Sequence, residues 1–247
     1  MKKTAILLAA LAAGAGLNAQ DLKTSYSVTT DFTYASEYVF RGIESAGNSF
    51  QPSIEVSVGD AYVGVWTNQP VTDNENNEVD FYAGYKFKVN DALSLEAVGT
   101  YYWYPEARGG STKRSYELGV GATYTYAGIS SSLYYYYDIR LHTNTLQASV
   151  GYSVPLEAIG TSVDFSVFAG TVEARDWAPD DNVGQVMETY NYYGFDITVP
   201  YKLNDKAAIT TGLHYAKNDN LGRVVGRPVS TVGDENLWVT VGLSVGF

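Results

Sequence analysis

Apolar and polar side chains alternate along most of this chain, and the alternation is strictest at its end. Residues 236–247 read NLWVTVGLSVGF, with an apolar side chain at every second position up to Phe247. Successive side chains of a strand point to opposite faces of its sheet, so this segment predicts a strand with one apolar face. Comparable segments upstream bring the expected number of strands to twelve: 25–35, 50–59, 61–68, 79–88, 92–104, 115–125, 129–138, 143–153, 161–171, 189–201, 206–217 and 236–247.

The connections between these segments alternate between long and short. Long polar stretches follow the first, third, fifth, ninth and eleventh segments, whereas short turns follow the even-numbered ones. Only the connection 139–142 is short where a long one is expected. An even number of antiparallel strands with short turns at one end and long loops at the other is typical of outer-membrane barrels. The sequence therefore predicts an all-β fold, a transmembrane antiparallel up-and-down β-barrel with short periplasmic turns and longer extracellular loops.

The apolar faces of the predicted strands fit a lipid environment. Their mid-strand positions carry no Lys, Arg, Asp or Glu, and a cation there would cost about 2–4 kcal/mol at the bilayer midplane. Aromatic residues on these faces gather toward both strand ends, as in the girdles of membrane barrels. The facing of 61–68 is ambiguous because both registers contain apolar residues, and we expect Tyr62 and Trp66 to face outward. A secreted β-sandwich is the alternative fold.

The first residues have the features of an export signal. Lys2 and Lys3 precede a short apolar run, and Ala19 or Ala15 offers a small-residue cleavage site. We therefore expect residues 1–19 to be removed and residues 20–247 to form the barrel. The chain has no Cys, which excludes a lipoprotein anchor. Without Lys2 and Lys3, 14 basic residues face 27 acidic ones, a net charge of −13 that argues against nucleic acid as a partner.

The inward faces of the predicted strands are polar and rich in carboxylates, and Lys86 is the main basic residue among them. Rings of acidic side chains select cations in channels, so these positions predict a lumen that favours cations. Alternatively, the acids pair with Arg41, Arg108 or Arg140 from loops folded inward, which would plug the barrel. The inward carboxylates are Asp31, Glu55, Asp80, Glu96, Glu117, Asp164 and Asp196.

Tyrosines also fall on the inward faces, mostly in the half nearer the long loops. Aromatic rings can guide sugars or bind cations through their faces, but they equally serve to fill an interior. These tyrosines are Tyr82, Tyr102, Tyr104, Tyr134, Tyr136 and Tyr192.

The residues that enzymes and metal sites require are scarce. His142 and His214 are the only histidines, they are far apart in the sequence, and no G-x-S-x-G motif accompanies them. Asp180 and Asp181 would hold calcium loosely, although a solvated acidic loop explains them equally well. We therefore expect no catalytic residues, no metal and no cofactor.

Residues 36–52 read SEYVFRGIESAGNSFQP and follow a predicted strand that contains several aromatic residues. This stretch resembles the signature of the TorF-like porin family, most strongly over residues 28–66. The resemblance implies an exported outer-membrane barrel of Gram-negative bacteria and supplies no substrate. Within it, Gly42 permits positive φ, and the Arg41 guanidinium can donate two parallel hydrogen bonds to a carboxylate. Arg41 either contacts Glu55 or Glu96 and narrows the lumen, or lies solvated in a surface turn.

These observations favour an outer-membrane channel for passive diffusion of small hydrophilic solutes, with a preference for cations. A structural or adhesive barrel with a blocked lumen is the first alternative, and an outer-membrane lipid enzyme using His142 or His214 is the second. The expected partners are outer-membrane lipids, small hydrophilic solutes and the barrel-assembly machinery, which would read the last strand ending at Phe247. Nucleic acid is not expected as a partner.

Overall fold

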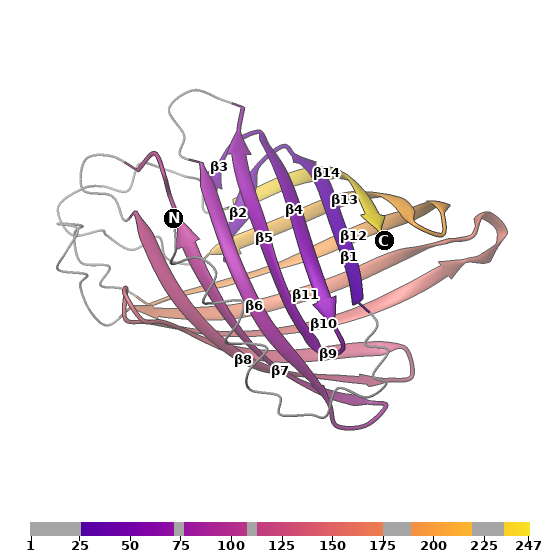
Figure 1. The fold of residues 1–247 in the computed structure, drawn as a ribbon, viewed down its shortest axis with the longest axis horizontal. Helices are drawn as coiled ribbons and strands as arrows, with labels where there is room; N and C mark the ends of the chain where they lie inside the picture. Colours follow the sequence, from indigo (N-terminus) through magenta and orange to yellow (C-terminus); the bar gives the residue numbers. More distant parts are fainter. Residues whose placement is uncertain (1–25, 72–76, 108–112, 175–188, 219–234) are drawn as a thin grey trace.

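The computed structural model describes residues 26–71, 77–107, 113–174, 189–218 and 235–247, and twelve of its strands form a closed antiparallel barrel (Figure 1). The predicted fold class is therefore confirmed, whereas the expected signal peptide, 1–19, lies outside the described residues. No helix in the described ranges is long and apolar enough to span a bilayer. The wall consists of β1 (Tyr26–Ala35), β4 (Ser49–Val58), β5 (Ala61–Pro70), β6 (Glu78–Lys88), β7 (Leu93–Trp103), β8 (Arg114–Tyr126), β9 (Ile129–Asp138), β10 (Thr143–Leu156), β11 (Thr161–Ala174), β12 (Tyr190–Asn204), β13 (Ala207–Asn218) and β14 (Glu235–Gly246).

The first and last wall strands close the cylinder. β1 pairs with β4 on one side and with β14 on the other. Phe247 takes part in this seam, because its amide donates to the carbonyl of Val28 at 2.9 Å and its carbonyl accepts from the Val28 amide at 3.3 Å. Closure leaves no open sheet edge, the condition for a sheet to lie in hydrocarbon.

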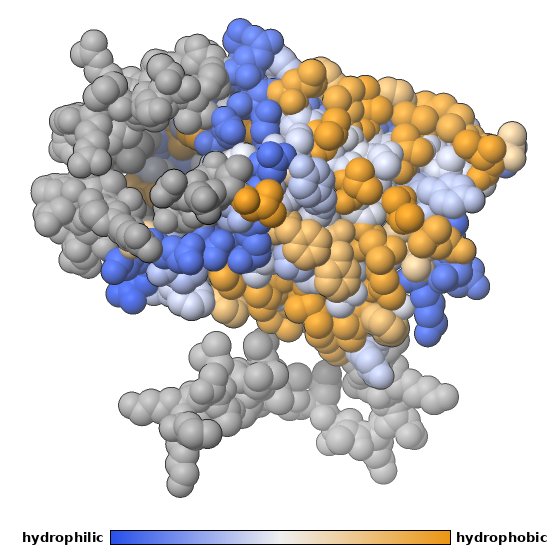
Figure 2. All heavy atoms as spheres, turned by 90° about the horizontal axis from the view of Figure 1, so that it is seen from above, coloured by the Kyte–Doolittle hydropathy of each residue, from blue (hydrophilic) through white to orange (hydrophobic). Residues whose placement is uncertain are grey.

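Side-chain alternation sorts the wall into an apolar outer face and a polar inner face. Leu118, Val120 and Leu133 lie outside, between 53% and 56% exposed. Figure 2 shows hydrophobic side chains in a broad zone over the outer surface, with hydrophilic ones toward both ends of the barrel. An apolar zone of this kind is the surface that a membrane barrel presents to lipid.

The expected facing of β5 is wrong. Tyr62 lies inside the barrel, where its hydroxyl donates to Glu96, and the Trp66 ring packs inside against Tyr38 at a centroid distance of 5.2 Å. Val63, in the other register, is 50% exposed on the outer face. Both registers of this strand are apolar, so hydropathy alone does not separate them. The hydroxyl and ring partners inside the barrel decide the register.

The segment expected to be a loop between residues 36 and 49 contains two short strands. β2 (Tyr38–Phe40) and β3 (Ile43–Ala46) pair through a two-residue turn formed by Arg41 and Gly42. Both turn residues have positive φ, 51° and 78°, as in the type I′ turns that match the twist of paired strands. The resulting β2–β3 hairpin folds into the lumen (Figure 1). Strands this short, set among polar residues, give no alternation that a sequence pattern can detect.

Five tyrosines that face the lumen each lie over a glycine of the neighbouring strand. Tyr62 is paired across the ladder with Gly84, and Tyr134 with Gly121. A Cβ on either glycine would lie 2.2 Å from a tyrosine side-chain atom. Glycine therefore provides the space in which the ring lies against the wall instead of projecting across the lumen. The other such pairs are Tyr82 with Gly64, Tyr136 with Gly119 and Tyr192 with Gly170.

A matched pair of substitutions on adjacent strands tests which face meets lipid. We expect Val120→Lys to lower the free energy of unfolding by about 2–4 kcal/mol, because its ammonium would enter hydrocarbon. Val98→Lys, on β7, places the same group among the side chains that line the lumen and should cost much less. Urea unfolding of the protein in lipid vesicles measures both. Equal losses would contradict the assignment of the two faces.

A second pair tests the role of the glycines. Gly121→Ala should destabilise the barrel by about 1–3 kcal/mol through overpacking, because its methyl group displaces Tyr134. Gly99→Ala is the control, since a Cβ there meets Leu118 at 3.4 Å, an ordinary contact. The same unfolding measurement distinguishes them, and a Gly121→Ala barrel as stable as the Gly99→Ala barrel would contradict the packing argument.

Candidate functional site

The tip of the β2–β3 hairpin is joined to β8 by a buried ion pair. Arg41 Nη1 donates to Oε2 of Glu117 at 2.7 Å, and Nη2 donates to Oε1 at 2.8 Å. The guanidinium also lies 4.6 Å from the ring centroid of Phe40 and 4.9 Å from that of Tyr136. The side chains of Arg41 and Glu117 are 12% and 5% exposed. A bidentate pair flanked by two rings fixes the direction of the hairpin tip.

Arg41 keeps its charge in this position. Burial alone would lower the pKa of the guanidinium, but the hydrogen bonds and negative charge of Glu117 outweigh burial and hold the pKa above its usual value. The sequence offered Glu55 and Glu96 as the lumen partners of Arg41, and the structure gives Glu117 instead. The difference arises because the hairpin crosses the lumen to β8 rather than remaining beside β4, where Glu55 lies.

The other side of the tip is attached to β13 and β14. The carbonyl of Gly42 accepts from Nδ2 of Asn218 at 2.7 Å and from Nδ2 of Asn236 at 3.5 Å. A Cβ on Gly42 would lie 2.7 Å from the Cβ of Tyr192, so only glycine fits. In the closed strand order, four strands separate β8 from β13 on one side and six on the other. The hairpin tip is thus tied to nearly opposite parts of the wall.

Cavities adjoin the hairpin on several sides. Phe40 and Arg41 line a cavity of about 380 Å³ together with Tyr104 and Asp138, residues at the end of the barrel where most of the longer connections lie. The same two residues line a second cavity of about 470 Å³ with Glu96. A third, of about 460 Å³, and a fourth, of about 240 Å³, adjoin Phe40 and Gly42 respectively. The hairpin narrows the lumen and leaves space around itself.

The carboxylates of the lumen are met mainly by hydroxyl groups. Glu96 accepts from Tyr62 and Tyr134, both at 2.5 Å, and Lys86 Nζ lies 3.9 Å from its Oε1. A neutral hydroxyl satisfies a carboxylate oxygen and leaves its charge in place. Four other sequence-predicted carboxylates follow the same pattern: Asp31 accepts from Ser53, Glu55 from Ser57 and Tyr82, Asp164 from Ser153, and Asp196 from Ser166.

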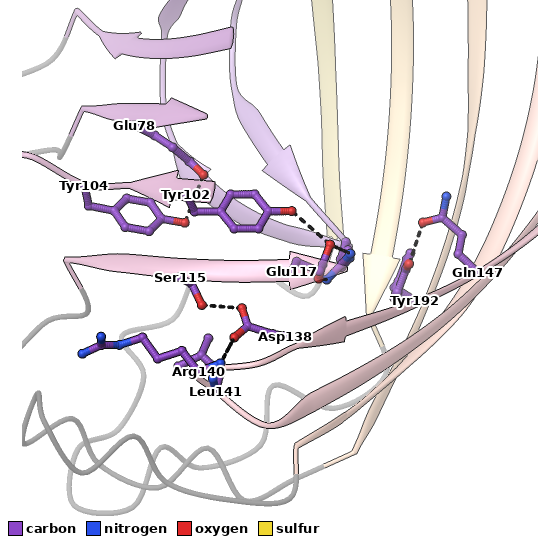
Figure 3. Close-up of polar contacts among 11 residues, drawn as sticks. Glu78, Tyr102, Tyr104, Ser115, Glu117, Asp138, Arg140, Leu141, Gln147 and Tyr192 are labelled. Carbon is purple, nitrogen blue, oxygen red and sulfur yellow. Dashed lines mark hydrogen bonds and ion pairs between the residues drawn. The ribbon is translucent and has the colours of Figure 1, made fainter. Parts of the chain in front are cut away.

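The long-loop half of the lumen holds a second group of acids and tyrosines (Figure 3). Tyr102 donates to Oε1 of Glu117 at 3.0 Å, and Tyr104 donates to Oε1 of Glu78 at 3.0 Å. Asp80 is 8% exposed, and its Oδ1 has no hydrogen-bond partner among the described residues. Tyr102 and Tyr104 thus hold carboxylates in place, a role that sequence reasoning did not assign to them.

Sequence reasoning also missed two buried acids in this half. Glu78 is 5% exposed, and Asp138 is 4% exposed. Asp138 accepts from Ser115 at 2.5 Å and from the amides of Arg140 and Leu141 at 2.9 and 2.7 Å (Figure 3). The alternation of faces along the strands was the available signal. Glu78 lies two residues from Asp80 and so shares its inward face, and Asp138 lies on the face of β9 opposite to that of its outward-facing residues.

Lys86 and the two histidines complete the polar groups of interest. Lys86 Nζ lies 5.2 Å from the ring centroid of Tyr62. His214 contacts Asp196 through Nδ1 at 2.7 Å and Thr240 through Nε2 at 2.9 Å, and His142 contacts Tyr137. In the described ranges, no group of three or more His, Asp and Glu is arranged to hold a metal ion. Arg108, Asp180 and Asp181 lie outside the described residues.

Solved porins share this fold. A KdgM porin superimposes with a TM-score of 0.56 at 11% identity, over 89% of this chain and 99% of that one. A NanC porin gives 0.55 at 13% identity, over 88% and 98%. The COG4313 outer membrane channel from Pseudomonas putida F1 gives 0.53 at 10% identity, over 94% and 98%. At such identities the similarity concerns the fold, which is that of outer-membrane porins.

Sequence comparison gives the family. No curated protein matches the chain. A family model described as "Bacterial protein of unknown function (Gcw_chp)" matches residues 19–245, nearly the whole chain, and its description does not carry the TorF-like name. The chain therefore belongs to the Gcw_chp family of bacterial proteins.

Proposed function

We propose that this protein is a porin-like channel of the Gram-negative outer membrane, through which small hydrophilic solutes diffuse passively and cations pass in preference to anions. The observation that carries the proposal is the excess of carboxylates over cations in the described lumen. Nine acids face the described lumen, among which Glu117 pairs with Arg41 and Glu96 with Lys86: Asp31, Glu55, Glu78, Asp80, Glu96, Glu117, Asp138, Asp164 and Asp196. We also propose that the protein is related to the TorF-like porins, which residues 28–66 resemble.

The electrostatics of the lumen support cation preference. Arg41 is matched by Glu117, so this pair contributes little net charge. Lys86 is 64% exposed and lies 3.9 Å from Glu96, which is a loose pairing. Of the remaining acids, Asp31, Glu55, Glu78, Asp138, Asp164 and Asp196 accept from neutral hydroxyls. A wall of low dielectric constant that carries charge of one sign concentrates ions of the other sign.

A barrel with a blocked lumen is the second candidate, and the hairpin is the observation that favours it. Its tip is held by Glu117 on one side and by Asn218 on the other. Against a complete block stand the cavities of about 380 and 470 Å³ that adjoin Arg41. We therefore propose that the hairpin constricts the passage without closing it.

We propose no catalytic role. Thr240, His214 and Asp196 form a chain of hydroxyl, imidazole and carboxylate groups, which is the order found in hydrolases. The His214 ring, however, stacks on Trp238 at 5.2 Å, and the adjoining cavity of about 240 Å³ is lined by Asp196 and Trp238 and not by Thr240. A hydroxyl outside the cavity lining is poorly placed to attack a substrate.

Planar bilayer recordings test the channel directly. Reconstituted protein should give discrete single-channel currents, and under a KCl gradient the reversal potential should have the sign of a cation-selective pore. Currents with an anion-selective reversal potential would refute the cation preference. Absence of currents would refute the channel and leave the blocked barrel.

A substitution at the hairpin tests the constriction. Arg41→Met removes the ion pair and leaves Glu117 uncompensated, so single-channel conductance and cation selectivity should both rise. Lys217→Met is the control, because the Lys217 ammonium pairs with Glu235 and takes no part in the side-chain contacts that hold the hairpin tip, although the Lys217 backbone lies beside it. If both variants behave like the unmodified protein, the hairpin does not set the conductance.

A further inference from the structure

We propose that the lumen contains a binding site for small organic cations that carry an alkylammonium group, formed by Glu96, Tyr62 and Tyr134. The site lies in the lumen of the proposed channel and rests on that function, to which it adds a class of solute.

The three side chains come from alternate strands. Glu96 lies on β7, Tyr62 on β5 and Tyr134 on β9, so each tyrosine reaches the carboxylate across one intervening strand. It does so over a glycine, Gly84 on β6 and Gly121 on β8. Each phenol donates to a different oxygen of Glu96 at 2.5 Å. The carboxylate is therefore held in one orientation with an aromatic ring on either side.

This arrangement suits a cation. Both phenols are neutral donors that place no positive charge beside Glu96, and the flanking rings offer the negative faces to which cations are attracted. The carboxylate is 15% exposed, so a solute in the lumen can reach it while solvent screening is reduced. The adjoining cavity of about 470 Å³, lined by all three residues, is large enough for a small organic solute.

The protein's own lysine already places an ammonium at this site. Lys86 Nζ lies 5.2 Å from the ring centroid of Tyr62 and 3.9 Å from Oε1 of Glu96. Its side chain is 64% exposed, so it is held loosely and can be displaced. An alkylammonium solute would take up the same contacts, with Lys86 as its competitor. The guanidinium of Arg41 lies similarly over Tyr136, whose ring stacks on Tyr134 at 5.8 Å.

Calorimetric titration of the folded, detergent-solubilised protein tests the site without requiring a current. Diaminobutane is the probe, and butanediol is the uncharged control of the same length. Diaminobutane should bind and butanediol should not. Glu96→Gln should weaken binding about tenfold or more, because it removes the charge that the ammonium pairs with. Asp164→Asn is the matched control, a lumen carboxylate on β11 with its own hydroxyl partner, Ser153, and should weaken binding far less than Glu96→Gln does.

Lys86→Met provides an independent variant whose change lies on an exposed side chain and does not threaten folding. Removal of the competing ammonium should strengthen diaminobutane binding severalfold. Absence of binding, equal weakening by Glu96→Gln and Asp164→Asn, or an unchanged affinity in Lys86→Met would each overturn the inference. Failure of the bilayer recordings would instead refute the proposed channel, while the calorimetric result would still decide whether the site binds an ammonium.

Discussion

Every backbone amide and carbonyl in the wall needs a partner in a neighbouring strand, because hydrocarbon supplies none. The seam between β1 and β14 meets this requirement and turns an open sheet into a cylinder. Phe247 extends the pairing to the last residue of the chain through its two hydrogen bonds with Val28. Once the cylinder is closed, alternate side chains of each strand face either the lipid or the lumen. The composition of each face follows from this separation.

Inside the cylinder, carboxylates and phenols depend on one another. A carboxylate such as Glu96 needs donors, and the tyrosines need acceptors for their hydroxyls. Glycines on the strands between them make the long reach of these rings possible. Five of the 22 tyrosines and five of the 24 glycines therefore share a structural cause in the lumen. Hydroxyl donors add no positive charge to such a network, which distinguishes it from a network of ion pairs.

The sequence was sufficient for the barrel and for most of the lumen. Strict alternation in segments such as 236–247 predicts both the strand and its two faces, and strand parity places Asp31, Glu96 and Asp196 inside. Parity fails for Tyr62 and Trp66, because both registers of β5 are apolar and only the partners on neighbouring strands choose between them. The β2–β3 hairpin was missed for a different reason: strands of three and four residues are too short to show a period. The pairing of Arg41 with Glu117 depends on the path of this hairpin, so no local pattern contains it.

The hairpin also has a mechanical effect on the barrel. A cylinder of tilted strands can flatten, since neighbouring strands hinge about their hydrogen bonds while remaining paired. Arg41 bonds to β8 and Gly42 to β13, so the hairpin tip connects two parts of the wall across the interior. Lateral pressure from the bilayer on those parts therefore acts on the Arg41–Glu117 pair as well as on the wall. A change in the roundness of the cross-section would therefore strain the contacts that hold the hairpin tip, and this couples the shape of the wall to the position of the hairpin.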